Sequence, residues 1–196
     1  VNNYINAMNH GIKRIVEDNF PFTSRLMREM HEILMHGVRG EHKTPGEFRK
    51  SQNFIGGSMP SNASYVPPSI IDMPDLISDL DKFINMVDEM PELIKIAIIH
   101  YQFESIHPFL DGNGRIGRLI IPLYLLSKQE LDKPCFYISD FFERNRLEYY
   151  GKLQNVRIKN DMIGWIKFFL KASIETSQSA KIKFKNAVKQ VESYRN

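Results

Sequence analysis

The sequence contains one cysteine, Cys135, among its 196 residues. A single cysteine excludes an intramolecular disulfide and a cysteine-rich zinc site, and it favours a reducing, cytoplasmic setting. Long apolar runs are also absent: the longest, 119–126, is far shorter than the roughly 20 residues that a membrane span requires. The first residues lack the basic flank and the apolar run of a signal peptide. We therefore expect neither a membrane-spanning nor a disulfide-stabilised protein.

A charge excess of one sign is likewise lacking, since 26 lysines and arginines face 23 aspartates and glutamates, for a net charge of +3. This balance gives no support to a nucleic-acid or membrane surface within the chain. Hydrophobic residues make up 42% of the sequence, enough to build a core without disulfides or metal. At roughly 150 residues per domain, the length predicts a single domain over 1–196 with its core at about 70–170.

Apolar residues recur at helical spacing along most of the chain. The pattern predicts a helix over 4–16 and a second helix that Thr23 or Ser24 caps and Gly37 ends. Further helices are predicted from Asp72, from Pro91 to 106, from 115 to about 128, and over 138–158 and 165–191. The helix from Pro91 is apolar on nearly all sides, which is typical of a central, buried helix. The predicted fold class is therefore mainly α.

One stretch, 36–69, departs from the helical pattern because glycine and proline are concentrated in it. Short extended segments at 52–55 and 65–66 predict a small β-hairpin flap within about 46–68. A loop of this length inside a compact domain is usually functional or disordered, and its aromatic residues argue against disorder. A glycine-rich loop without function is the competing interpretation.

The segment 107–118 lies between two predicted buried helices and carries the chemistry of the chain. Gly112 and Gly114 flank Asn113 at a helix start, where small residues let main-chain N–H groups form an anion-binding concavity. Arg115 and Arg118 are three residues apart and project from one side of the first turn. Because cations disfavour a helix N-terminus, the two arginines indicate a bound anion, and their forked guanidiniums suit phosphate.

Two further residues of this segment add an acid and a base. Asp111 is unexpected in a pure anion site unless a Mg²⁺ ion bridges its carboxylate to the phosphates. His107 is the residue of the set that can accept a proton near neutral pH. The competing interpretation is a plain helix–helix connection with Asn113 in a left-handed turn, which leaves the aspartate and both arginines unexplained.

These residues resemble the signature of the Fic-domain family, His-x-Phe-x-(Asp/Glu)-Gly-Asn-Gly-Arg-x-x-Arg, at every defined position of 107–118. Segments 46–49, 52–57 and 63–68 are similar to the family's flap region, and 143–150 to its nucleotide-facing later helix. The resemblance extends from about Tyr4 to the last helix. It implies a Fic-like helical bundle with a small β-hairpin flap.

The resemblance also implies an activity: transfer of AMP from ATP to a Ser, Thr or Tyr hydroxyl of a protein, with release of pyrophosphate. His107 would be the catalytic general base, and Asp111 would hold the cofactor Mg²⁺ against the α- and β-phosphates. The ATP-binding residues implied are Asp111, Gly112, Asn113, Gly114, Arg115, Ile116, Gly117 and Arg118. Phe109 is expected to anchor the loop in the core.

Two regions outside the signature complete the implied site. The flap residues Ile55, Gly56 and Gly57 resemble the place where the family docks a target segment as an added strand. Tyr149 and Tyr150 are expected to form an adenine wall by stacking, with core aromatics of a helix as the alternative. The implied partners are ATP and a protein substrate; modification of the chain itself and a homodimer stay open.

Many relatives carry an inhibitory motif, (Ser/Thr)-x-x-x-Glu-(Gly/Asn), and no glutamate of this sequence is followed by glycine or asparagine. The sequence most resembles the subgroup with an N-terminal inhibitory helix. We therefore expect that this chain is a fragment, that the inhibitory segment precedes Val1 in a longer protein, and that the fragment binds ATP more productively than the longer protein.

Alternative functions keep the same nucleotide site. Some relatives transfer phosphate, UMP or phosphocholine, although Gly114 and Arg115 fit the AMP-transferring pattern. A nucleotide-sensing regulatory module is an interpretation of another class. His107 argues against it, because a sensor requires the phosphate cradle but not the base.

Overall fold

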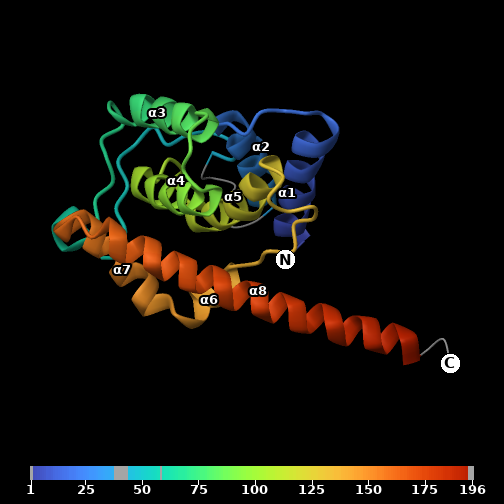
Figure 1. Cartoon of the computed structure of the whole chain (residues 1–196). Coiled ribbons are helices and arrows are strands. Elements are labelled where there is room, and N and C mark those ends of the chain that lie inside the picture. The colour runs from blue at the N-terminus through green and yellow to red at the C-terminus, as the bar shows by residue number, and fades with distance from the viewer. Residues whose placement is uncertain (1, 38–43, 58, 194–196) are drawn as a thin grey trace. The chain divides into compact units, whose positions relative to one another are not determined.

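The computed structural model describes residues 2–37, 44–57 and 59–193 (Figure 1). The chain divides into two compact units, Val1–Asp132 and Lys133–Asn196. Helices dominate the described part of both units, which confirms the predicted fold class. Among the described helices, none combines the length and the apolar character that a membrane span requires. The prediction that 1–196 forms a single domain stays a prediction.

The first unit contains the helices that the apolar spacing predicted. They are α1 (Asn2–Ile12), which continues into a π-helical turn at Lys13–Glu17, α2 (Ser24–Met35), α3 (Met73–Asn85), α4 (Glu92–Ile106) and α5 (Asn113–Ser127) (Figure 1). A short 3-10 helix at Pro60–Asn62 was not predicted. Helix α4 contacts α3 and α5, and α5 also contacts α1, α2 and the π-helical turn. The loop between α4 and α5 therefore joins the two helices that lie deepest in this unit.

Burial explains why the two ends of this loop are fixed. Ten of the 15 residues of α4 are buried, as the prediction of a central helix required, and α5 is buried from Ile116 to Leu126 except for Arg118. Each fully buried aliphatic side chain contributes about 1.5–3 kcal/mol by leaving water. The helices on both sides of the loop are thus held by many apolar contacts, and the loop has little freedom.

The start of α2 is capped differently from the prediction. Neither Thr23 nor Ser24 caps the helix with its own side chain. Instead, the Ser24 main-chain N–H and Oγ–H donate to the Asp81 carboxylate of α3, at 2.7 and 2.6 Å. A carboxylate satisfies an exposed helix N–H and complements the positive end of the helix, which a local hydroxyl does less strongly. The cap therefore also ties α2 to α3.

The prediction of a β-hairpin in the flap was wrong. The described residues of 46–68 form one isolated antiparallel bridge, between Ile55 and Tyr65, and no strand. After Ile55 the chain turns at once through Gly56 and Gly57, whose φ angles are 66° and 87°. On the other side Pro67 has no N–H to continue a ladder. Ser58 of the flap lies outside the described residues.

The second unit contains α6 (Ser139–Arg144), α7 (Arg146–Lys159) and α8 (Met162–Ser193). The helix predicted over 138–158 is thus interrupted at Asn145, whose φ and ψ of −111° and 32° are not helical. An aromatic cluster joins the three helices: Phe141, Phe142, Tyr149, Trp165, Phe168 and Phe169. The first half of α8 contributes Trp165, Phe168 and Phe169 to this cluster, and residues 181–190 of the same helix are exposed.

Candidate active site

His107 ends α4 in a conformation that few residues adopt. Its φ and ψ are 50° and 59°, in the left-handed region, and its main-chain N–H donates to Phe103 O at 3.0 Å. A non-glycine residue held in this region costs about 1–3 kcal/mol, and such residues cluster at functional sites. The strain turns the chain sharply out of the helix, so the imidazole stands at the entrance of the loop.

The hydrogen bonding of the His107 ring favours one tautomer. Its Nδ1 lies 3.4 Å from the main-chain oxygen of Glu104, an atom that can only accept. In the neutral ring Nδ1 therefore carries the proton and Nε2 carries the lone pair. A lone pair on Nε2 is what a general base needs.

Arg49 fixes His107 to the flap, and the sequence analysis did not identify this role. The Arg49 side chain is buried, and its Nε donates to His107 O at 3.0 Å and its Nη2 to Pro68 O at 2.5 Å. Its main-chain N–H donates to Pro108 O at 2.8 Å. Burial lowers the pKa of the Arg49 guanidinium. No carboxylate lies within 4 Å of Arg49 in the described part of the chain, so main-chain oxygens hold this cation in place.

Replacing Arg49 by methionine tests this clamp. Because the oxygens of His107 and Pro68 lose their donor, at about 1–3 kcal/mol each, we expect the free energy of unfolding to fall by about 2–6 kcal/mol. The flap should also be cleaved faster by a protease. Thermal unfolding and limited proteolysis measure the two effects. Lys50→Met is the matched control, since the Lys50 side chain is 82% exposed; equal losses in both variants would contradict the clamp.

The predicted anion-binding concavity lies at residues 112–114, and we call it the cradle. Its donors are main-chain groups. The Asn113 side chain is turned inward, since its Oδ1 accepts from Phe109 N–H at 2.9 Å and its Nδ2 donates to Phe109 O at 2.7 Å. Phe109 is fully buried, as the anchoring role predicted. Among the described residues, the main-chain N–H groups of Asn113 and Gly114 have no acceptor. These two donors at the start of α5 are therefore available to an anion.

The two glycines of the cradle differ in how strictly their positions require glycine. Gly112 has a φ of 80°, and a Cβ there would lie 3.1 Å from Met35 Sδ and 3.3 Å from His31 Nε2. A side chain at Gly112 would thus be both strained and crowded. At Gly114 a Cβ would lie 3.2 Å from Arg118 Nη1, so the Arg118 guanidinium lies over this glycine.

The two arginines lie at different places around the loop. Arg115 Nη2 is 3.6 Å from Asp111 Oδ1 and 3.3 Å from Met35 Sδ. Arg115 also lines a hollow of about 650 Å³ together with residues of α1 and α2. Arg118 lies beside Gly114, and no carboxylate of the described chain lies within 4 Å of its guanidinium. Its positive charge is thus available close to the two main-chain donors.

Ile116 and Gly117, also predicted as ATP-binding, lie on the buried side of α5. Ile116 is fully buried, and a Cβ on Gly117 would lie 2.3 Å from Glu104 Oε1 and 3.3 Å from His100 Cε1. His100 Nδ1 donates to Gly117 O at 2.9 Å, and burial lowers the pKa of His100 to about 4. These contacts pack the first turns of α5 against α4, and the buried Ile116 side chain is not accessible to a ligand.

Asp111 meets the requirements for a Mg²⁺ ion that is shared with phosphates. Its side chain is 53% exposed, and its Oδ1 accepts from Gly112 N–H at 2.6 Å. The described residues contain no group of three His, Cys, Asp or Glu that could hold a metal ion alone. Mg²⁺ usually keeps several waters and uses one or two carboxylates together with substrate phosphates. One accessible carboxylate beside two open N–H donors fits that mode of binding.

His31 of α2 is a second residue that the sequence analysis did not assign to the site. Its ring is fully buried, Nδ1 accepts from Gly46 N–H at 2.9 Å, and Nε2 faces Asp111 O at 3.0 Å. The ring stacks on Phe109, with centroids 3.8 Å apart and planes at 7°. Helical spacing marked its neighbours as core residues, but no local pattern shows that this histidine touches the loop.

The flap residues lie on a segment that is tied to α4 and the loop. Ile55 exchanges main-chain hydrogen bonds with Tyr65, and Tyr65 Oη donates to Ser105 O at 2.8 Å. Asn53 Nδ2 donates to Phe109 O at 3.1 Å. Ile55, Gly56 and Gly57 therefore sit at the turn of a segment whose two sides are held against the end of α4 and the loop.

Tyr149 and Tyr150 belong to the second unit, and their environments differ. Tyr149 is buried and stacks on Phe142, with centroids 4.6 Å apart and planes at 24°. Tyr150 is half-exposed, and the Arg146 guanidinium lies 5.6 Å from its ring centroid. Tyr149 is thus a core aromatic within its unit. An adenine wall formed by either ring stays a prediction.

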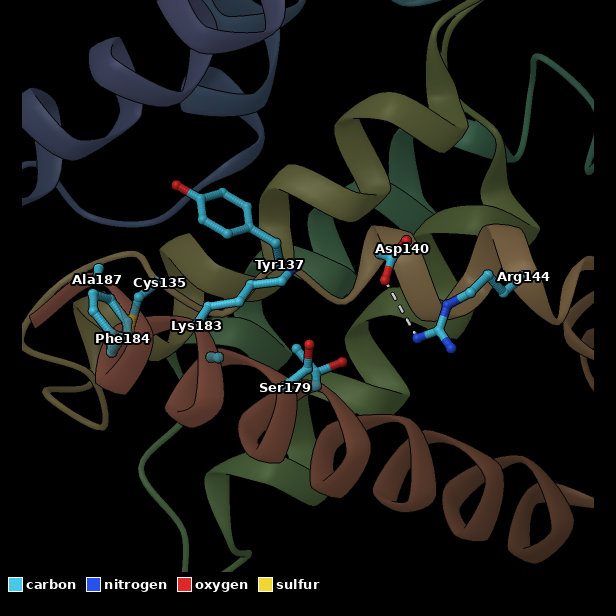
Figure 2. A pocket seen from close by; sticks show the side chains of 10 residues that line it. Cys135, Tyr137, Asp140, Arg144, Ser179, Lys183, Phe184 and Ala187 are labelled. Atoms are coloured by element: carbon cyan, nitrogen blue, oxygen red, sulfur yellow. Dashed lines mark ion pairs between the residues drawn. The ribbon is translucent and has the colours of Figure 1, made fainter. Parts of the chain in front are cut away.

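The second unit also contains an apolar groove of about 330 Å³, which Figure 2 shows. Cys135, Phe184 and Ala187 gather at one end, and the Lys183 stem runs toward Tyr137 (Figure 2). Asp140 and Arg144 form an ion pair at 3.3 Å on its wall. None of the predicted site residues lines this groove. Arg144 is paired with Asp140, so the groove does not present a phosphate-binding arrangement like the start of α5.

Comparisons with known proteins identify the family of the chain. The family model described as Fic/DOC family matches residues 21–125, which include the whole of 107–118. A Caenorhabditis briggsae protein named protein adenylyltransferase fic-1 is 27% identical over 159 residues, covering 76% of this chain and 29% of that protein. A Culex quinquefasciatus protein named protein adenylyltransferase Fic is 29% identical over 167 residues, covering 84% of this chain and 29% of that protein. The chain thus spans less than a third of these curated relatives.

Solved structures give the same result for the fold. A Fic family protein from Desulfovibrio desulfuricans G20 matches 93% of this chain and 52% of its own, with a TM-score of 0.75 and 26% identity. Fic-1 from C. elegans covers 94% of this chain and 52% of its own, with a TM-score of 0.65. At 21% identity the second match concerns the fold alone.

Proposed function

Since the chain belongs to the Fic/DOC family, we propose that it is a protein adenylyltransferase, which moves AMP from ATP to a hydroxyl group of a protein. The observation that carries the proposal is the arrangement at the end of α4 and the start of α5. There an imidazole whose Nδ1 faces a carbonyl oxygen shares a short loop with two main-chain donors that have no acceptor among the described residues. The names of the curated relatives support the same reaction class.

The chemistry assigns each side chain a step. His107 Nε2 takes the proton of the attacking hydroxyl, whose oxygen forms a bond to the α-phosphorus. The bond from the α-phosphorus to the bridging oxygen of the β-phosphate breaks, and pyrophosphate leaves with that oxygen. The N–H groups of Asn113 and Gly114 would bind the α-phosphate oxygens as their charge grows. Arg118 and Arg115 would bind the β- and γ-phosphates.

Asp111 would hold Mg²⁺ together with the phosphates. When bound, the ion neutralises phosphate charge and orients the leaving pyrophosphate. The Gly112 N–H that bonds Asp111 Oδ1 keeps the carboxylate on the loop, so Oδ2 is the oxygen left for the ion. Asp111 also forms an ion pair with Arg115, at 3.6 Å between Oδ1 and Nη2. The proposed metal ligand is thus in contact with the arginine that lines the hollow beside α1 and α2.

Asp111→Asn tests the metal assignment through ATP binding. Because asparagine removes the negative charge that attracts the ion, we expect the ATP affinity measured with Mg²⁺ to fall about tenfold, or about 1.4 kcal/mol. In EDTA the affinities of the wild type and the variant should agree within about twofold. Calorimetric titration with and without Mg²⁺ gives both numbers. A tenfold loss that persists in EDTA would show that Asp111 shapes the loop rather than holding the ion.

The remaining roles concern the two substrates. We propose that the flap docks a segment of the target protein at Ile55, Gly56 and Gly57, where the two glycines are exposed and form a turn with positive φ angles. Tyr150, half-exposed, is the better candidate for stacking on adenine, and Tyr149 would support it. The protein target, modification of the chain itself, a homodimer, the inhibitory helix ahead of Val1 and a cytoplasmic setting stay predictions.

Two labelled forms of ATP test the proposed reaction. The chain is incubated with candidate target proteins and ATP labelled at either the α- or the γ-phosphate. We expect the α-label on protein and the γ-label in pyrophosphate. Transfer of the γ-label would favour a phosphate-transferring relative, and no transfer with ATP or UTP but tight nucleotide binding would favour a nucleotide sensor.

A further inference from the structure

We propose that His31 is a positioning residue that couples the flap to the phosphate-binding loop. It does so through two hydrogen bonds from opposite ring nitrogens, one to Gly46 at the base of the flap and one to Asp111 in the loop. The consequence for catalysis rests on the proposed function. The coupling itself is a property of this chain that nucleotide binding alone can reveal.

The two bonds require a single protonation state and tautomer of His31. Gly46 N–H is a donor, so Nδ1, at 2.9 Å, must accept and carry no proton. Asp111 O is an acceptor, so Nε2, at 3.0 Å, must donate. Only a neutral ring with its proton on Nε2 meets both requirements. The ring therefore acts as a rigid spacer between two main-chain groups.

The loop meets the His31 ring at further points. The ring stacks on Phe109 at 3.8 Å between centroids, and a Cβ on Gly112 would lie 3.3 Å from Nε2. The segment 109–112 is thus packed along one face and one edge of the imidazole. Any shift of the ring would displace the residues directly before the N–H donors of Asn113 and Gly114.

The flap end of the spacer is equally restrained. Gly46 has a φ of 76°, and Arg28 Nε donates to its carbonyl oxygen at 2.7 Å. A Cβ on Gly46 would lie 3.1 Å from Glu32 Cβ, so the main chain lies directly on α2. Both polar groups of Gly46 are therefore bound by α2 side chains, three residues before Arg49, which clamps His107.

Any buried histidine needs partners for its ring nitrogens, so what distinguishes His31 is where its two partners lie. Here the Nδ1 partner lies in the flap region and the Nε2 partner in the loop, 15 and 80 residues away along the chain. Because the two bonds leave from opposite ends of one rigid ring, a change at either end must alter the other. Docking of a target segment on the flap and binding of ATP to the loop are consequently linked.

Two variants separate the bonds. An asparagine amide reaches the position of Nδ1 and a glutamine amide that of Nε2, so His31→Asn keeps the Gly46 bond and His31→Gln keeps the Asp111 bond. For His31→Gln we expect hydrogen exchange of the Gly46 amide to accelerate about tenfold, while the ATP affinity stays within about twofold. For His31→Asn we expect the opposite: an ATP affinity about fivefold to tenfold lower, with Gly46 exchange within about twofold.

The same variants give a kinetic split if the chain transfers AMP. His31→Gln should raise the KM for the target protein and His31→Asn the KM for ATP. His10→Gln is the matched control, because His10 bonds Glu29 on the other side of α2 and should change neither quantity. Equal losses of both quantities in both His31 variants, in proportion to lost thermal stability, would overturn the coupling in favour of a merely structural histidine.

A measurement on the wild type covers the case in which the variants do not fold. Binding of Mg²⁺ and ATP should slow hydrogen exchange of the Gly46 amide severalfold, although Gly46 is not a predicted ligand. Unchanged exchange at Gly46 in the presence of saturating ATP would overturn the proposal. Because neither measurement requires AMP transfer, absence of transfer would refute the proposed function and leave the coupling to be decided by exchange and affinity.

Discussion

His107→Ala is expected to lower AMP transfer by about 10²–10⁴-fold while the ATP affinity changes by less than about threefold. Loss of a general base removes a contribution of this size to the rate, whereas the main-chain donors of the cradle stay in place. The ring stands at the end of α4 with Nδ1 facing Glu104 O, and its removal leaves the Asn113–Phe109 bonds untouched. Initial rates with labelled ATP and calorimetric titration measure the two quantities.

A second variant, His107→Asn, controls for strain in the main chain at this position. Because His107 has a φ of 50°, alanine is strained there and part of a rate loss could come from a displaced loop. His107→Asn tolerates the left-handed conformation and also lacks a base of suitable pKa. The two variants should lose the same activity. Near-normal transfer by His107→Asn would contradict the assignment of the base.

The second large effect is expected at Arg118. Arg118→Ala should weaken ATP binding about 10–100-fold, because charge-assisted bonds from a guanidinium to phosphate contribute about 1.5–3 kcal/mol. The structure leaves this cation without a carboxylate partner among the described residues and places it beside Gly114, next to the open N–H donors. Calorimetric titration with ATP, ADP and AMP measures the loss.

The comparison between nucleotides makes the Arg118 test specific. Since the guanidinium is assigned to the outer phosphates, the loss should be largest for ATP and smallest for AMP. Arg118→Lys keeps the charge but not the forked donor geometry and should lie between the wild type and Arg118→Ala. Arg25→Ala, with a side chain that is 73% exposed, is the control. An equal loss for all three nucleotides would contradict the assignment.

Local patterns were sufficient to predict the helices and the loop. Apolar spacing placed the described α-helices of the first unit, and the all-round apolar helix is α4, with ten of its 15 residues buried. The loop could be found because its chemistry is packed into 12 consecutive residues between two such helices. Where the partners of a residue lie within a few positions of it, spacing carries the information.

Contacts between distant segments could not be predicted in this way. Arg49 reaches His107 across 58 residues, and His31 reaches Asp111 across 80. The inward turn of the Asn113 side chain was also not predicted, because it depends on two hydrogen bonds to the main chain of the buried Phe109. The hairpin prediction was wrong for a related reason. In place of a main-chain ladder, the Gln52 side chain bonds Pro67 O across the flap, and the Asn53 side chain bonds Phe109 O of the loop.

The most direct test of the site is a crystal structure of the chain with Mg²⁺ and a non-hydrolysable ATP analogue. We predict phosphate oxygens within about 3.2 Å of the main-chain nitrogens of Asn113 and Gly114, with Arg118 on the outer phosphates and the His107 ring beside the α-phosphate. A nucleotide bound elsewhere, for example in the groove that Cys135 and Phe184 line, or phosphates remote from the start of α5, would contradict the account.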